Sequence, residues 1–434
     1  MTKYPSFFVK ILQGEDSGKI LGPCDGMEGF PCEEWINSTC SISYEEISFE
    51  QALQNLKTIY PQLLKDFPQF RLKIIKIKDW HHWKYAENSE IKFDDLISIQ
   101  ENYDDSVPKS FPLDTNPIWR LHIINLKDQK KIKLKFYASH ALADGRSIFL
   151  YLDLFLNISI HQKISENFSK VKDLPIITSF HKKDYFTKEI ADNISMPESW
   201  NKLIEINLYP KVTLPSYIVN TQWNFNYPPI SKYLRKINVT PQALLMTIYQ
   251  RALRKYHQGK IDNLTLGVHT HINCLNTKYC KEKFKNYIFY QTAGVTIIFI
   301  EKQNSILEDL IYCRDKLKEG MKTPESCICY CYESYLVNEK TLEITIPEKM
   351  PNIYKHNLIF VSNLGKVCVG KKDVKFGLKF DVTDDGYWPN LYCFNNNETF
   401  SLVLLHPNNI EKKFIDIIHD TSKEIINFIY NNQE

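Results

Sequence analysis

The stretch 117–160 constrains the fold of this chain most, because it specifies three consecutive elements and the turns between them. Its first part, PIWRLHIINLKDQKKIKLKFYAS, alternates apolar and polar residues on both sides of the polar turn Lys127–Lys131, which predicts a β-hairpin. The alternation stops at Ser139, and SHALADG separates it from RSIFLYLDLFLNI, an apolar segment of helical length. A strand that runs through a short turn into an apolar helix is typical of mixed α/β domains.

Strand and helix signals continue in two parts of similar size. A helix is predicted from about Ser48 to Tyr60, with Ser48 as its cap and Gln51 completing a capping box, before a proline-punctuated turn. In the second part, Thr240 caps a helix that Gly259 ends. Further strands are predicted near 70–77, 263–272, 295–300, 358–362, 391–394 and 400–405, and further helices at 306–318 and 410–430. The fold class is therefore predicted to be α/β with mixed sheets.

The length of 434 residues allows two or three domains at roughly 100–200 residues each. We expect an N-terminal half at 1–165 and a C-terminal half at 216–434. The segment 166–215 between them is dotted with prolines and only weakly periodic, and we interpret it as a connection.

The charge balance, the apolar runs and the cysteine content exclude some classes of protein and indicate a compartment. The chain has 54 basic and 51 acidic residues, a net charge of +3 that is too balanced for electrostatic binding of nucleic acid. Its apolar runs are far shorter than the ~20 residues that cross a bilayer, so no transmembrane segment is expected. The N-terminus lacks the apolar core of a signal peptide, and the 11 cysteines are odd in number, which favours reduced thiols. We expect a cytoplasmic protein and a monomer.

The turn His140-Ala-Leu-Ala-Asp144-Gly145 carries the residues best suited to chemistry. A histidine directly after a strand is held by the sheet, and its neutral imidazole can accept a proton from an alcohol or amine. Asp144 can bend back to fix the loop, and Gly145 allows a tight backbone without a Cβ clash. Taken alone, His140 could equally be a structural histidine whose hydrogen bonds are satisfied within the turn.

This motif and its surroundings resemble the chloramphenicol acetyltransferase-like superfamily, whose members share His-x-x-x-Asp-Gly at the centre of a two-domain pseudodimer. FPLDTNPIWRLHIINL at 111–126 is similar to the strand before that motif, and 52–56 with PQLLKDFPQFRLKI to the early helix and turn. The similar segments of the second half are 239–256, 360–367 and 394–406. Together these segments cover most of the chain in the order of the superfamily.

Two details of the resemblance indicate a branch. Ser139 stands where peptide-synthetase condensation domains and wax ester synthases have a second histidine. The D-F-G-W-G signature of plant BAHD acyltransferases is missing, and DDGYW at 384–388 does not replace it. The remaining similarity is to the alcohol acetyltransferase-like branch, which uses acyl-CoA.

The resemblance implies a pseudodimer with an interdomain tunnel and an acyl transfer, most simply of acetyl, to a hydroxyl or amine. His140 would be the general base for direct attack on acyl-CoA, which is a co-substrate and not a bound cofactor. Asp144 would be structural and Gly145 a conformational necessity. The implied substrate-lining residues are Ser362, Asn363 and Gly365, for which a plain strand-to-turn transition is equally open. The oxyanion could be stabilised by a backbone N–H near Gly145 or by the Asn363 amide.

One departure from the superfamily leaves alternatives. The superfamily usually pairs the motif aspartate with an arginine of the second domain, yet LGVHTHINCL at 266–275 has none. Either His269 or His271 replaces it, or Asp144 has another partner. A non-catalytic binding or scaffold protein that keeps the fold is the competing class, and a carrier protein is an alternative acyl donor. His269, His271, Cys274 and Cys280 do not match a zinc spacing, so no metal is expected.

Overall fold

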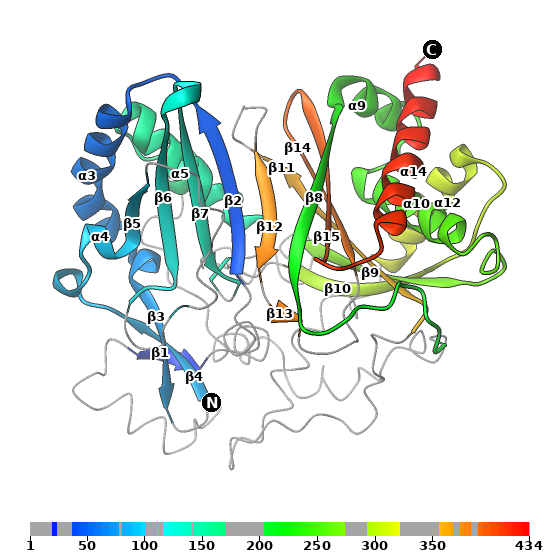
Figure 1. Ribbon diagram of the computed structural model, residues 1–434, viewed down its shortest axis with the longest axis horizontal. Helices are drawn as coiled ribbons and strands as arrows, with labels where there is room; N and C mark the ends of the chain where they lie inside the picture. The colour runs from blue at the N-terminus through cyan, green and yellow to red at the C-terminus, as the bar shows by residue number, and fades with distance from the viewer. Residues whose placement is uncertain are drawn as a thin grey trace.

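The computed structural model describes residues 20–23, 37–77, 80–100, 111, 116–140, 142–143, 145–169, 204–273, 293–321, 356–367, 374–379, 381–382 and 389–433. Within these ranges the strands form three mixed or antiparallel sheets. The two larger sheets, each with helices on its outer side, lie side by side (Figure 1).

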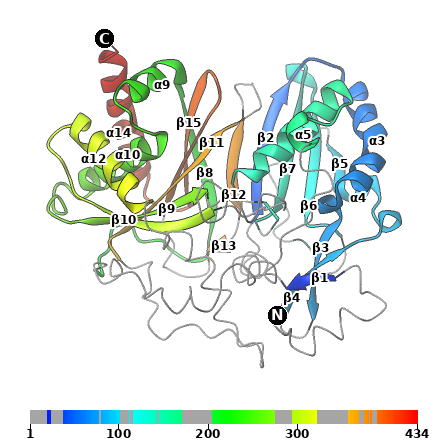
Figure 2. The same cartoon turned by 180° about the vertical axis from the view of Figure 1, so that it is seen from behind.

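The first large sheet has five strands and carries the predicted hairpin. Its order is β12 (Lys375–Lys379), β2 (Asn37–Tyr44), β7 (Lys131–Ser139), β6 (Trp119–Leu126) and β5 (Ile97–Gln100). β6 and β7 pair in antiparallel fashion around the short η3 turn (Lys127–Gln129), which confirms the hairpin. The helices α3 (Phe49–Asp66) and α5 (Ser147–His161) pack against each other on one face, which is toward the viewer in Figure 2.

Short elements surround this sheet. A separate three-stranded sheet has the order β1 (Ile20–Pro23), β4 (Trp80–Tyr85) and β3 (Leu72–Ile77). The short helices are η1 (Pro68–Arg71), η2 (Asn88–Glu90), α4 (Phe93–Leu96) and α6 (Glu166–Ser169).

The second large sheet has seven strands. Its order is β10 (Ala293–Ile300), β9 (Leu266–Asn273), β11 (Leu358–Lys366), β14 (Asn390–Asn395), β15 (Thr399–Pro407), β8 (Ser216–Asn226) and β13 (Asp381–Val382). Its helices are α9 (Tyr227–Lys236), α10 (Pro241–Tyr256), α12 (Ile306–Gly320) and α14 (Lys412–Asn431). The predicted helices of this half are therefore confirmed, and the Thr240 hydroxyl accepts from the Ala243 N–H at 3.3 Å as its cap. None of the described helices is long and apolar enough to cross a bilayer.

Two hydrophobic cores correspond to the two large sheets. One packs α3 and α5 against the five-stranded sheet, and the other packs α10, α12 and α14 against the seven-stranded sheet. Leu208, which falls in the predicted connecting segment 166–215, is buried in the second core. The Tyr209 hydroxyl next to it donates to the Leu358 carbonyl of β11 at 2.9 Å. The C-terminal end of the connecting segment thus packs on the second half, whereas Phe168 at its N-terminal end is buried in the first core.

Strand β12 crosses between the halves. It follows β11 in the sequence, yet it pairs with β2 as the edge strand of the five-stranded sheet, as Figure 1 shows. Side chains of β8 bind it from the other side: Asn220 donates to the Phe376 carbonyl at 3.1 Å, and Gln222 to the Val374 carbonyl at 2.9 Å. A strand from the second half of the sequence therefore completes the sheet of the first half. The expected boundary at 216 assigns β12 to the second half only.

The first helix is longer than predicted. It continues through Pro61 to Asp66, because the apolar stripe goes on with buried Leu63 and Leu64. Pro61 removes one hydrogen bond to the Lys57 carbonyl, but both residues are exposed, so water can satisfy that oxygen. The Ser48 hydroxyl caps the Gln51 N–H at 3.2 Å, while the Gln51 side chain donates to Asn55 instead of completing a capping box.

Candidate functional site

The site begins where β7 ends. The Ser139 N–H still donates to the Ile118 carbonyl at 2.9 Å, so the sheet holds the strand to its last residue. The Ser139 carbonyl then accepts from the N–H groups of Leu142 at 2.9 Å and Ala143 at 3.3 Å. This tight turn brings the Ala143 carbonyl back toward the side chain of His140.

The imidazole of His140 is half-buried in this turn. Its Nδ1 lies 3.0 Å from the Ala143 carbonyl oxygen, which can only accept a hydrogen bond. Nδ1 must therefore carry the proton in the neutral ring, and Nε2 is the nitrogen with the lone pair. The turn thus favours the tautomer that a general base at Nε2 requires.

Ser38 contacts the same two groups from the neighbouring strand β2. Its Oγ lies 3.2 Å from His140 Nδ1 and donates to the Ala143 carbonyl at 3.3 Å. Ser38 is fully buried. Ser38 was not predicted from the sequence, because the alternation in NSTCSISY does not report which strand it pairs with or that it lies beside a turn 102 positions away.

Gly145 meets the second half of the chain. A Cβ built on it would lie 2.5 Å from Cδ2 of Leu364, a buried residue of β11. The backbone of Gly145 is not in the left-handed region, so the difference between glycine and alanine here is that an added Cβ would force the Leu364 side chain to shift. The benefit expected of glycine, a turn without a Cβ clash, therefore concerns the contact with Leu364. Asp144 and Ala141 lie outside the described residues.

Aromatic contacts next to the turn also join the halves. The ring of Phe149, in the first turn of α5, lies 5.7 Å from that of Phe376 on β12. It lies 5.1 Å from the ring of Phe394 on β14. Leu142, Ala143 and Leu364 belong to the same buried cluster. The turn that bears His140 is therefore packed against the second half of the chain, and Leu364 is a contact that sequence reasoning did not single out.

The Leu364 contact gives a stability prediction. Gly145→Ala forces Leu364 to move within a packed region, and we expect it to lower the free energy of unfolding by about 1–3 kcal/mol. Leu364→Val removes the δ-carbons that clash, so the double variant should recover part of that loss. A double-mutant cycle in urea should give a coupling of at least about 0.5 kcal/mol.

The matched control for this cycle is Gly259→Ala. Gly259 follows α10 with φ +78°, and its nearest atom to an added Cβ is 3.7 Å away on Asp262. Its substitution should therefore be strained but additive with Leu364→Val. Equal coupling in the two cycles would show that the contact at Gly145 is not specific.

The segment Ser362-Asn363-Leu364-Gly365 forms a bulge at the end of β11. The Asn363 carboxamide oxygen accepts from the Gly365 N–H at 2.9 Å and from Cys393 Sγ at 3.5 Å. Gly365 has φ +81°, a conformation that favours glycine, and the pairing with β14 shifts register between Asn363 and Lys366. Ser362 is buried. The oxygen of Asn363 is thus used within the bulge, and its amide donor is the end suited to a substrate oxygen.

His269 lies on β9, directly opposite Phe360 of β11 in the sheet. Its ring stacks on the Phe360 ring with centroids 3.9 Å apart. The side chain of His271 and the whole of Asp144 lie outside the described residues, so the pairing expected for Asp144 stays a prediction.

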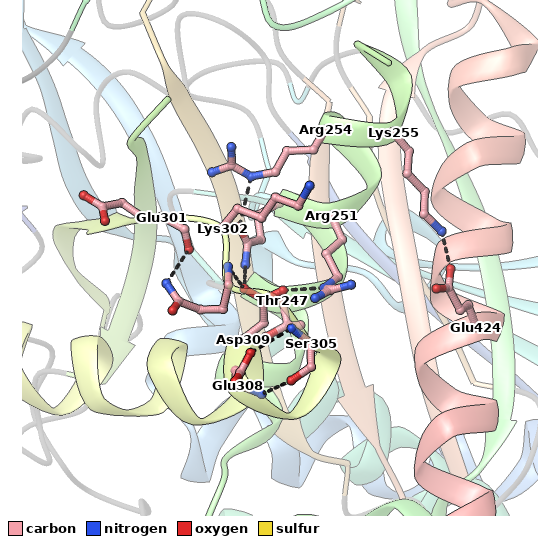
Figure 3. Close-up of polar contacts among 12 residues, drawn as sticks. Thr247, Arg251, Arg254, Lys255, Glu301, Lys302, Ser305, Glu308, Asp309 and Glu424 are labelled. Atoms are coloured by element: carbon pink, nitrogen blue, oxygen red, sulfur yellow. Dashed lines mark hydrogen bonds and ion pairs between the residues drawn. The ribbon is translucent and has the colours of Figure 1, made fainter. Parts of the chain in front are cut away.

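A second polar cluster lies between α10 and α12 (Figure 3). Its centre is Asp309, which is fully buried and forms an ion pair with Arg251. Asp309 also accepts from the Gln250 side chain and from the Gln303 N–H, both at 2.9 Å. Because these partners are the protein's own groups, we interpret the cluster as a structural connection between helices.

Comparisons with known proteins find similarity in structure but not in sequence. No protein-family model matches the sequence, and no curated protein matches it. The epimerization domain from the third module of tyrocidine synthetase B superposes with a TM-score of 0.65 at 11% identity, over 97% of this chain and 99% of that chain. Polyketide synthase associated protein 5 from Mycobacterium tuberculosis gives 0.61 at 11% identity, over 94% and 99%. The condensation domain from Monacolin K polyketide synthase gives 0.59 at 11% identity, over 96% and 99%.

Identity this low shows the fold alone. The chain has the mixed-sheet, two-domain fold of the chloramphenicol acetyltransferase-like superfamily, which confirms the predicted fold class. The similar structures include an epimerization domain and a condensation domain. In the sequence, Ser139 stands where peptide-synthetase condensation domains have a second histidine, which favours another branch. The alcohol acetyltransferase-like branch stays a prediction.

Proposed function

We propose that this chain is an acyltransferase that moves an acyl group from acyl-CoA to a hydroxyl or amine acceptor. The observation that supports this most is the hydrogen bond from His140 Nδ1 to the Ala143 carbonyl. It leaves the lone pair on Nε2, as a general base needs, at a turn where both halves of the chain meet.

The proposed reaction needs no covalent acyl-enzyme. Nε2 of His140 takes the proton of the acceptor as its oxygen or nitrogen attacks the thioester carbonyl carbon. The tetrahedral intermediate then collapses, the carbon–sulfur bond breaks, and the imidazolium returns the proton to the leaving sulfur. During this cycle the Ala143 carbonyl faces Nδ1–H, and its dipole favours the transient positive charge.

Two groups are suited to stabilise the oxyanion of this intermediate. One is a backbone N–H near Gly145, and the other is the amide donor of Asn363, whose oxygen is already occupied in the bulge. In this proposal Asp144 fixes the turn, and Ser362 and Gly365 shape the end of β11. Donor and acceptor reach the imidazole from opposite sides of a passage between the halves, so that both meet one base.

The test is the release of CoA thiol from acetyl-CoA by the full chain, with and without a panel of alcohols and amines. We expect release above the buffer rate, faster with a true acceptor, and an acceptor that gains an acetyl group by mass. Longer acyl-CoAs and an acyl carrier protein replace the donor in parallel arms to identify its class. A protein that consumes none of these thioesters would overturn the proposal.

The missing arginine on β9 favours a second candidate, a binding protein that keeps the fold without the activity. Such a protein would bind an acyl-CoA in calorimetry, yet thiol release would stay at the buffer rate with every acceptor. If this candidate is correct, the variant His269→Arg, which restores an arginine on β9, should gain thiol release. Turnover by the unaltered chain would exclude the candidate.

A further inference from the structure

We propose that Ser38 is a positioning residue for His140, which it acts on through Nδ1. The inference rests on the proposed function for its catalytic consequence, but its structural part concerns the tautomer and orientation of one imidazole. Ser38 belongs to no motif of the sequence, and it reaches His140 only because β2 pairs with β7.

The strand pairing sets the position of Ser38. It lies opposite Ala138 in the antiparallel register, two residues before His140 in the neighbouring strand. Cys40, two residues further along β2 and on the same face, donates its thiol to the Ile148 carbonyl of α5 at 3.3 Å. This face of β2 therefore points toward the turn and the start of α5, which places the Ser38 hydroxyl beside Nδ1 of His140.

The three polar atoms form a closed triangle. Ser38 Oγ lies 3.2 Å from His140 Nδ1 and 3.3 Å from the Ala143 oxygen, and Nδ1 lies 3.0 Å from that oxygen. The carbonyl has no proton, so both other atoms donate to it, and the lone pairs of Oγ can also accept from Nδ1–H. All three contacts are favourable only when Nδ1 is protonated.

The opposite tautomer would place two lone pairs against each other. With the proton on Nε2, the lone pair of Nδ1 would face the Ala143 oxygen at 3.0 Å, and only the Ser38 hydroxyl could then donate to the ring. Because Ser38 is buried, no solvent water substitutes easily for its hydroxyl. The serine thus adds a second acceptor that holds the ring plane in line with the carbonyl.

The experiment compares Ser38→Ala with Ser41→Ala. Ser41 lies on the same strand and is buried, but it points to the opposite face, so it controls for loss of a hydroxyl from β2. Protein labelled with ¹⁵N-histidine reports the tautomer through long-range ¹⁵N–¹H correlations, and the His140 signals are those absent from His140→Ala. Thiol release is measured on the same samples.

We expect the unaltered chain and Ser41→Ala to hold His140 with its proton on Nδ1. Ser38→Ala should show a mixture of the two tautomers and a rate lower by about 2- to 10-fold, the effect of one hydrogen bond. Ser38→Thr keeps the hydroxyl and should restore the single tautomer. If alanine prevents folding, Ser38→Cys keeps the volume with a weak hydrogen-bonding thiol and should shift the tautomers in the same direction.

An unchanged tautomer in Ser38→Ala, or in Ser38→Cys where the alanine variant does not fold, would overturn the role of Ser38. That result leaves the proposed function standing where the unaltered chain turns over and His140→Ala does not. Conversely, a chain without turnover in which Ser38→Ala still mixes the tautomers would refute the function and keep the positioning role.

Discussion

Replacing His140 by alanine is expected to lower the rate of acyl transfer by roughly 10²- to 10⁴-fold, the usual contribution of a general base. The expectation rests on the proposed role of His140 as general base, with Nδ1 bonded to the Ala143 carbonyl and the lone pair on Nε2. The rate is measured as acceptor-dependent release of CoA thiol at saturating acetyl-CoA. Stability should change much less, because the imidazole is only half-buried and alanine can occupy the same turn.

The control for this variant is His161→Ala, which removes an exposed histidine at the end of α5. It should transfer acyl groups at the rate of the unaltered chain. If His140→Ala kept its activity within a few-fold of that rate while remaining folded, His140 would not be the base.

Asp309→Ala is expected to lower the free energy of unfolding by about 3–5 kcal/mol, the cost of removing one member of a buried ion pair. Asp309 is fully buried, and its loss would leave Arg251, the Gln250 amide and the Gln303 N–H without their acceptor. The same carboxylate stands in the first turn of α12, where a negative charge favours the helix. Urea unfolding followed by intrinsic fluorescence measures the change.

The matched control lies on the same helix. Asp315 also pairs with an arginine, Arg314, at 2.7 Å, but more than half of its side chain is exposed. Asp315→Ala should therefore cost under about 1 kcal/mol, as exposed pairs do. Similar losses for the two variants would mean that burial does not determine the strength of the Asp309 cluster.

The elements that the sequence predicts well are those with a strong local signal. The capped, amphipathic α10 and the alternating β6–β7 hairpin needed no tertiary information. Strand β8 was missed because SYIVNTQWNFN mixes polar and apolar residues on a surface that is mostly half-buried. Strand β12 was missed because its partner, β2, comes from the other half of the chain, and no local pattern reports such a pairing.

The candidate site also combines features that have a local sequence signal with features that depend on distant strands. The end of β7 and the placement of His140 on a turn follow from a strand pattern that stops at one residue. The contacts that define the site do not, because Ser38 and Leu364 reach the turn from distant strands. The sequence also could not identify Leu364 as the side chain that a Cβ at position 145 would meet, because Leu364 comes from a distant strand.

Thiol release from S-acetyl pantetheine is the simplest measurement of thioester cleavage that depends on His140. This thioester presents the arm that CoA and carrier proteins share, so the result does not depend on which of them is the natural donor. We expect release that rises in proportion to protein concentration and falls to the buffer rate in folded His140→Ala. Release that is absent from the unaltered chain, or equal in the two proteins, would contradict this expectation.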